Sequence, residues 1–173
     1  MSDFVVRQAQ PGDAAALVAL AEAVGSEPEG WLISDRRWRS LGEERRYLRA
    51  VRRHPDAAVF VLETEAGIVG RLSVGRDAHP ASRHVADLGL MVAAGERRRG
   101  VGRALLEQAV EWARESEISK LELHVFPHND PAIRLYESFG FVREGLRRRH
   151  YRRGDEYVDA ILMAYEVDPD EGP

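Results

Sequence analysis

The strongest constraint in this sequence is a pair of glycines that separates an apolar segment from an amphipathic one. Residues 84–92, HVADLGLMV, form a nearly continuous apolar run, which is typical of a buried central strand. From Val101 onward, apolar residues recur at helical spacing. Gly100 and Gly102 lie at the junction, in the stretch RRRGVGR. The order of strand, glycine-containing turn and helix therefore predicts a β–α unit whose helix begins at the glycines.

A helix that starts directly after glycine is suited to bind an anion. The first turn of a helix has backbone N–H groups without intrahelical partners and carries a partial positive charge. Glycine lets the backbone come close to a phosphate group. The sequence has neither the Gly-Lys-Ser/Thr of a Walker loop nor the third glycine of a dinucleotide-binding turn. The pattern predicts a pyrophosphate site, and a solvated arginine run at a helix start is the alternative.

Length and composition limit the remaining classes. The 173 residues, of which 44% are hydrophobic, predict one domain over residues 1–167 and a frayed tail over 168–173. The net charge of -4 argues against a nucleic-acid partner, and the absence of cysteine excludes a thiol nucleophile and a thiolate metal site. No apolar run is long enough for a membrane span, so we expect a cytoplasmic protein without a membrane or metal partner.

Periodicity along the chain predicts an α/β fold with a mixed sheet of six to seven strands and about four helices on both faces. Asp13 is a candidate cap for the first helix, and Ser40 with Glu43 forms a candidate capping box for the second. We expect strands at 4–8, 57–63, 67–75, 84–92, 120–126, 146–153 and 157–167, and helices at 14–24, 41–53, from 101 onward, and from 129 to about 139.

Two motifs together resemble the GNAT superfamily of acyl-CoA-dependent N-acetyltransferases. Arg97-x-x-Gly100-x-Gly102 matches the pyrophosphate loop of that family, and VFPHNDPAIRLYESFGF resembles its second motif. The resemblance covers residues 84–145 strongly and the rest in outline, and it implies the GNAT fold with acetyl-CoA as acetyl donor. It also implies an enzyme rather than the other class that we keep open, a non-catalytic acyl-CoA-binding regulatory module.

The resemblance implies a set of contacts to coenzyme A. The loop would hold the pyrophosphate mainly through backbone amides, with Arg97 beside it. The main chain of the central strand would pair with the pantetheine arm as an added strand does, and Asn129 resembles the family's side-chain contact to that arm. The implied residues are Leu90, Met91, Val92, Arg97, Arg98, Arg99, Gly100, Val101, Gly102, Arg103 and Asn129.

Without cysteine, direct attack of the amine on the thioester in a ternary complex is the expected mechanism. Tyr136 resembles the family's tyrosine near the sulfur, a general acid for the thiolate; the alternative is a helix tyrosine that packs against Phe139. His124 stands where ribosomal-protein acetyltransferases of the family carry a glutamate. Asp87, in the strand before the loop, is the other candidate base, because a carboxylate in a buried strand requires a partner. A hydrogen bond to backbone or to His84 is its structural alternative.

The closest resemblance within the family is to bacterial amino-acid N-acetyltransferases. This resemblance implies a primary amine of a small molecule, an amino acid, as acceptor. An α-amine with a pKa of about 8 needs less help from a base than a lysine-type amine near 10.4, so the weak base candidates favour an α-amine. We expect Trp31, Asp87 and Tyr157 to contact this acceptor. Protein N-termini, polyamines and antibiotics are alternative acceptors, and the family's frequent homodimers make a homodimer an open expectation.

Overall fold

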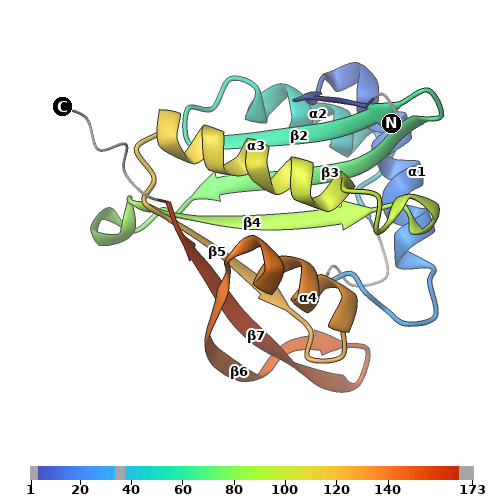
Figure 1. The fold of residues 1–173 in the computed structure, drawn as a ribbon. Coiled ribbons are helices and arrows are strands. Elements are labelled where there is room, and N and C mark those ends of the chain that lie inside the picture. The colour runs from blue at the N-terminus through green and yellow to red at the C-terminus, as the bar shows by residue number, and fades with distance from the viewer. Residues whose placement is uncertain (1–3, 34–37, 168–173) are drawn as a thin grey trace. The chain divides into compact units, whose positions relative to one another are not determined.

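The computed structural model describes residues 4–33 and 38–167. Within these ranges, seven strands form one mixed sheet in the order β1-β2-β3-β4-β5-β7-β6, accompanied by four α-helices (Figure 1). This confirms the predicted α/β class and the number of elements. The strands are β1 (Val5–Gln8), β2 (Ala57–Thr64), β3 (Gly67–Arg76), β4 (Val85–Val92), β5 (Lys120–Val125), β6 (Val142–Arg153) and β7 (Glu156–Glu166). The helices are α1 (Ala14–Gly25), α2 (Leu41–Val51), α3 (Val101–Glu115) and α4 (Asp130–Phe139).

The chain divides into two compact units. The first comprises Met1–Gly75 and Gly89–Ala109, and the second comprises Arg76–Leu88 and Val110–Pro173. Both β4 and α3 continue across the boundary. The single domain expected over residues 1–167 stays a prediction, and the tail at 168–173 lies outside the described residues.

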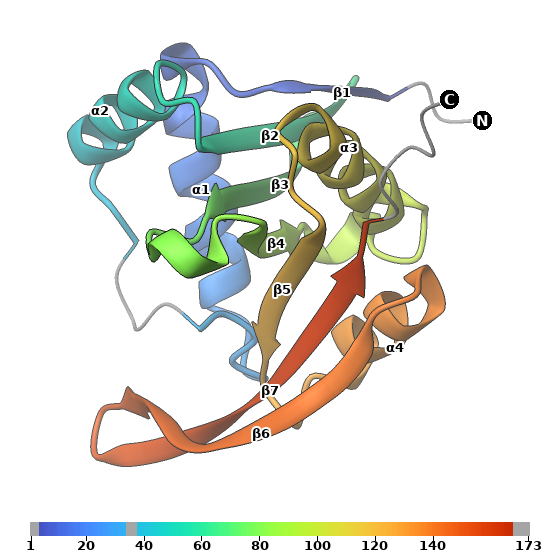
Figure 2. The ribbon, with the colours of Figure 1, turned by 90° about the vertical axis from the view of Figure 1, so that its left-hand side faces the viewer.

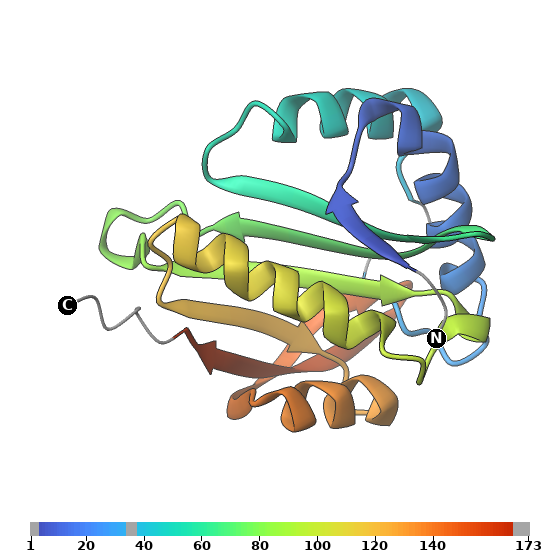
Figure 3. The ribbon, with the colours of Figure 1, turned by 45° about the horizontal axis from the view of Figure 1, so that its top comes forward.

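In the first unit, β1, β2 and β3 pair antiparallel, with the predicted turn between Thr64 and Gly67. β2 is buried over most of its length, as expected for a strand that has neighbours on both sides. Figure 3 shows α1 and α2 next to each other beside this antiparallel sheet. Apolar residues of the two helices, such as Leu17 and Leu48, join strand residues such as Val61 in one core cluster.

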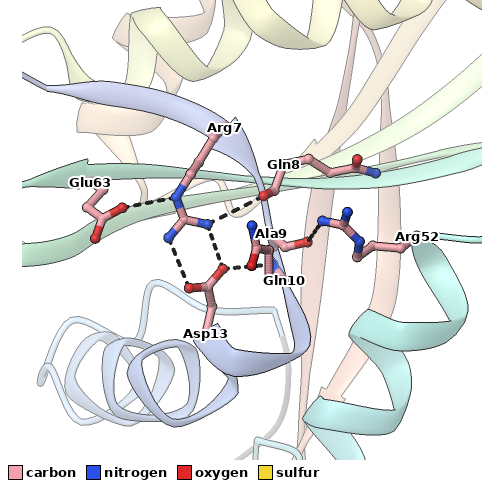
Figure 4. A network of polar contacts seen from close by, with 7 residues as sticks. All are labelled: Arg7, Gln8, Ala9, Gln10, Asp13, Arg52 and Glu63. Carbon is pink, nitrogen blue, oxygen red and sulfur yellow. Dashed lines mark hydrogen bonds and ion pairs between the residues drawn. The ribbon is translucent and has the colours of Figure 1, made fainter.

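The Asp13 side chain does not cap α1, contrary to our expectation. Asp13 occupies the N-cap position of the helix, but its side chain makes no cap bond. Its carboxylate instead accepts hydrogen bonds of 2.8 and 3.0 Å from Arg7 and one of 2.7 Å from the backbone N–H of Gln10 (Figure 4). A paired arginine is a stronger donor than a helix amide, and this contact joins β1 to the start of the helix.

Helix α2 begins as the sequence predicts. The backbone N–H of Glu43 donates to Ser40 Oγ at 3.4 Å, and the backbone N–H of Ser40 donates to Glu43 Oε2 at 2.8 Å. These reciprocal bonds are the predicted capping box. The helix also carries a fully buried carboxylate, Glu44, which lies 3.3 Å from the guanidinium of Arg71 on β3.

In the second unit, β7 lies between β5 and β6 and is antiparallel to both. Figure 2 shows β6 and β7 as a long curved hairpin, with α4 beside the part of it that is closer to β5. β5 alternates regularly: Leu121, Leu123 and Val125 are buried, whereas Glu122 and His124 are partly exposed. One face of this sheet therefore belongs to the hydrophobic core and the other carries polar groups.

Candidate active site

The predicted anion loop has the backbone geometry that such a site requires. Arg98 and Gly100 both have positive φ angles, 63° and 87°, and α3 begins at the next residue, Val101. A Cβ added to Gly100 would meet no atom within 4 Å, so the space beside this residue is open. Alternating backbone conformations of this kind turn successive N–H groups toward one point. A loop of this kind at a helix N-terminus is compatible with an anion site, and the pyrophosphate contact stays a prediction.

A second glycine brings α3 close to the sheet. A Cβ at Gly70 on β3 would lie 2.8 Å from a methyl group of Val101 and 2.9 Å from one of Leu105. Such distances are too short for real side chains, so the first turns of the helix pack directly on the glycine backbone. The sequence offered no clear signal for this role, because a glycine inside a strand pattern indicates only a bulge or some close approach.

Arg97 fixes the start of the loop. Its guanidinium donates to both carboxylate oxygens of Glu27, at 2.7 and 2.6 Å, and to the carbonyl of Val92 at 3.1 Å. This hydrogen bonding with Arg97 is the main reason that the pKa of Glu27 lies below its usual value of 4.5. Trp31 donates from its indole N–H to the same carboxylate at 2.9 Å. Trp31, predicted to contact the acceptor, and Arg97, predicted to lie beside the pyrophosphate, are thus joined through Glu27. Glu27 was not among the residues identified from the sequence.

The main chain predicted to hold the pantetheine arm lies at the end of β4. Met91 is buried, whereas Leu90 and Val92 are partly exposed. β4 pairs with β5 over only three residues, Val85–Asp87, and the recorded register does not continue to Leu90.

Asp87 marks the last pair of this short parallel ladder, opposite Glu122. The buried, partnered carboxylate that we predicted is not observed: β4 alternates between buried and exposed residues, and Asp87 is exposed. Although the residue is accessible to solvent, protein atoms surround much of its carboxylate. This partial desolvation is the main reason that the pKa of Asp87 is raised to about 6, and the charge of Glu122 is the second. Arg147 acts in the opposite direction. A carboxylate with a pKa of about 6 is a stronger base than an ordinary aspartate.

His124 lies on the same face as Asp87, two residues beyond Glu122 on β5. Its Nδ1 is 2.7 Å from the hydroxyl of Tyr151, and its ring meets that of His150 edge-on at 5.1 Å. Desolvation, then the charge of Arg147, lowers the pKa of His124 below its usual value of 6.5. A neutral imidazole bonded to a phenol can accept or relay a proton.

The predicted cofactor contact, Asn129, is the N-cap residue of α4, and the predicted acid, Tyr136, lies within that helix. Asn129 accepts a hydrogen bond from the backbone N–H of Ala132 at 3.3 Å, so its side-chain oxygen caps the helix. Tyr136 is buried and packs against Phe141, with ring centroids 5.6 Å apart. Burial raises the pKa of the Tyr136 phenol well above its usual value of 10.

Tyr157 lies on the other face of β7 from His124. His124 is opposite Leu162, whereas Tyr157 is an odd number of residues away from Leu162 along the strand. The ring of Tyr157 is half-exposed, with the guanidinium of Arg149 4.4 Å from its centroid. The register therefore brings Asp87, His124 and Tyr151 to one face and leaves Tyr157 on the opposite one.

Two negative findings concern the described residues alone. Across residues 4–33 and 38–167, no group of three or more histidine and acidic side chains is placed to hold a metal ion. No helix within the same ranges is long and apolar enough to cross a membrane.

Comparison with known proteins gives consistent matches. The profile of the Acetyltransferase (GNAT) family matches residues 21–141. The L-amino acid N-acetyltransferase AaaT of Escherichia coli K12 is 31% identical over 95% of this chain and 98% of its own length. An acetyltransferase of the GNAT family from Streptococcus pneumoniae has a TM-score of 0.80 and 28% identity, and the match covers 96% of this chain and 100% of that one. A structure of yncA from Salmonella typhimurium with its cofactor acetyl-CoA matches in fold, with a TM-score of 0.84 at 21% identity over 99% and 98% of the two chains.

Proposed function

Since this chain belongs to the GNAT family of acetyltransferases, we propose that it transfers the acetyl group of acetyl-CoA to the α-amine of a free amino acid. Acetyl-CoA-dependent N-acetyl transfer is the activity of the family. The similarity to an L-amino acid N-acetyltransferase over nearly the whole chain supports the finer assignment. The observation that carries it is the placement of the Asp87 carboxylate on the same sheet face as His124, where its pKa is raised to about 6.

The loop residues fit the diphosphate of the donor. Gly100 combines a left-handed backbone with open space, and α3 starts directly after it. Backbone donors at a helix N-terminus bind phosphate without requiring particular side chains. Arg98, Arg99 and Arg103 are exposed and would add positive charge around this point. When bound, acetyl-CoA supplies the activated acetyl thioester.

The base must remove a proton from the acceptor's ammonium group. A base with a pKa of about 6 is about two pH units below the α-amine of a peptide N-terminus near 8, a cost of roughly 3 kcal/mol, and about four units below a lysine-type amine, roughly 6 kcal/mol. The α-amine of a free amino acid costs more than the first value, because its own carboxylate stabilises the ammonium form. An ordinary aspartate near 3.9 would add about 3 kcal/mol to either value. We therefore assign the general base to Asp87, with His124 as a relay or alternative base beside it.

The amine nitrogen attacks the thioester carbonyl, and the carbon–sulfur bond breaks to release the thiolate of coenzyme A. Tyr136 is the proposed partner of this thiolate. Tyr136→Phe should lower kcat by about tenfold to a hundredfold while the dissociation constant of acetyl-CoA stays unchanged, because only a hydrogen bond to the developing thiolate charge is removed. Single-turnover kinetics together with calorimetry would measure both quantities.

An acceptor screen tests the proposal. The protein is incubated with acetyl-CoA and, in separate reactions, with L-amino acids, peptides with free N-termini, polyamines and aminoglycosides, and thiol release is followed. Preferred release with amino acids supports the proposed acceptor. Preferred release with another class would replace it, and tight acetyl-CoA binding without release under any condition would indicate a regulatory binding module instead.

A further inference from the structure

The β5–β7–β6 sheet of the second unit aligns a row of functional side chains on one face. His124 is opposite Leu162 on β7, and Leu162 is opposite Gly145 on β6. Two residues along β6, Arg147 pairs with Ala160, so it shares this face with His124. Asp87 pairs with Glu122, which is two residues from His124. The register therefore places an acid and an arginine on either side of His124.

An irregularity in β6 completes this arrangement. The pairing with β7 shifts between Arg147 and Tyr151, and Arg149 inside the shifted segment has a φ of 53°. The backbone N–H of Arg149 donates to Asp159 at 2.7 Å, which fixes the bulge. The shift places Tyr151 opposite Val158, two residues along β7 from Ala160, so that Tyr151 stays on the face of Arg147 and its hydroxyl reaches His124. Bulges commonly redirect side chains beside functional sites.

The charges on this face are opposite but not joined. The charge of Arg147 lowers the pKa of Asp87, of His124 and of Tyr151. Both Arg147 and Asp87 are exposed. Within the part of the chain that the structure describes, no ion pair joins the two side chains. Two accessible groups of opposite charge on one face are complementary to a ligand that itself carries both charges.

We propose that Arg147 binds the α-carboxylate of the acceptor while Asp87 receives its α-ammonium group, so that this face selects zwitterionic amino acids. This inference rests on the proposed function, because it names the residue that would recognise the proposed amino-acid acceptor. Glu122 and Asp77 add negative charge around Asp87 and favour the ammonium end there. Arginine presents two parallel donors that match a carboxylate. A polyamine has no group for Arg147, and a peptide N-terminus carries an amide in place of the carboxylate.

The same contact assists the chemistry. A free amino acid holds its proton more firmly than a peptide N-terminus, because the nearby carboxylate stabilises the ammonium form. An arginine bound to that carboxylate offsets its charge and so favours loss of the proton. Arg147 would therefore contribute to reactivity as well as to binding, and only for acceptors that have the carboxylate.

The test compares each accepted L-amino acid with its carboxamide. For wild type and for Arg147→Gln, kcat/KM is measured with both acceptors, and the value for the acid is divided by the value for the amide. Comparing this acid-to-amide ratio between the two proteins cancels the intrinsic difference in reactivity between the two amines. We expect Arg147→Gln to lower this ratio by roughly 10- to 100-fold, the range for loss of a charge-assisted hydrogen bond, and Arg147→Lys to retain part of it. Arg148→Gln is the matched control, since it removes the same charge from the adjacent exposed position.

The outcomes separate the two levels of inference. A reduced acid-to-amide ratio for Arg147→Gln, with an unchanged ratio for Arg148→Gln and unchanged thermal stability, supports the carboxylate contact. An unchanged ratio overturns it while leaving the α-amine acceptor intact. If wild type acetylates neither acids nor amides, the proposed function fails and the carboxylate contact fails with it. Calorimetric titration of the amino acid into each variant provides a readout that does not depend on turnover.

Discussion

The contact between Arg97 and Glu27 should make a measurable contribution to stability. The two side chains form a pair of parallel hydrogen bonds of 2.7 and 2.6 Å and are 30% and 18% exposed. Exposed ion pairs contribute up to about 1 kcal/mol, whereas removing one partner of a buried pair costs about 3–5 kcal/mol. For this intermediate burial we expect Glu27→Gln to destabilise the protein by about 2 kcal/mol. At this chain length the melting temperature would fall by roughly 4–8 °C.

The pH dependence of this loss gives a second check. Because Arg97 lowers the pKa of Glu27, the stabilisation is present above the unfolded value of 4.5 and is lost as the pH falls through the folded value. The difference between wild type and Glu27→Gln should therefore be large at pH 7 and shrink toward pH 3. Denaturant unfolding at both pH values measures it, with Glu96→Gln as control because Glu96 pairs with the more exposed Arg99 at 3.0 Å. Equal stability of wild type and Glu27→Gln at pH 7 would refute this reasoning.

Two further predictions concern the donor loop and the base. Gly100→Ala should weaken acetyl-CoA binding at least tenfold in calorimetry, because a side chain strains a backbone with φ of 87°; Gly95→Ala, also in open space but without a positive φ, should bind normally, and equal affinities would contradict the loop assignment. In pH–rate profiles, kcat/KM should fall about tenfold per pH unit below pH 6 as Asp87 becomes protonated. Asp87→Asn should remove this acidic limb of the profile, whereas His124→Gln should retain it. Persistence of the limb in Asp87→Asn would mean that another group is the base.

The sequence predicts the fold well because its signals are local. Helix periodicity, the Ser40–Glu43 capping box and the glycine before α3 each act within a few residues, and each prediction is confirmed. Asp13 illustrates the limit, since its partner Arg7 competes with the cap from the preceding strand. The local sequence pattern identifies possible hydrogen-bond partners of a side chain such as Asp13, but it does not determine which of them the folded chain uses.

The polar face of the second unit was only partly predictable, because it depends on strand register. Asp87 and His124 were identifiable as candidate bases from residue type and position. Tyr151 and Arg147 were not, since a shift in pairing between Arg143 and Gly145 decides which residues of the arginine-rich segment share the face of His124. A plain alternation over that segment gives no sign of the shift. The shift before Gly145 thus determines that Arg147, and not Arg148, shares the face of the candidate base.

The burial of Tyr136 narrows what its hydroxyl can do for the leaving thiolate. A thiol has a pKa of about 8.5, so proton transfer from an ordinary phenol near 10 to a thiolate is already uphill by about 2 kcal/mol. Burial raises the pKa of Tyr136 further, which makes complete transfer less favourable still. The same burial strengthens a hydrogen bond from the neutral phenol to a developing negative charge, because little water competes for it. The expected role of Tyr136 is therefore to stabilise the thiolate as a neutral donor, and solvent then supplies the proton after the carbon–sulfur bond has broken.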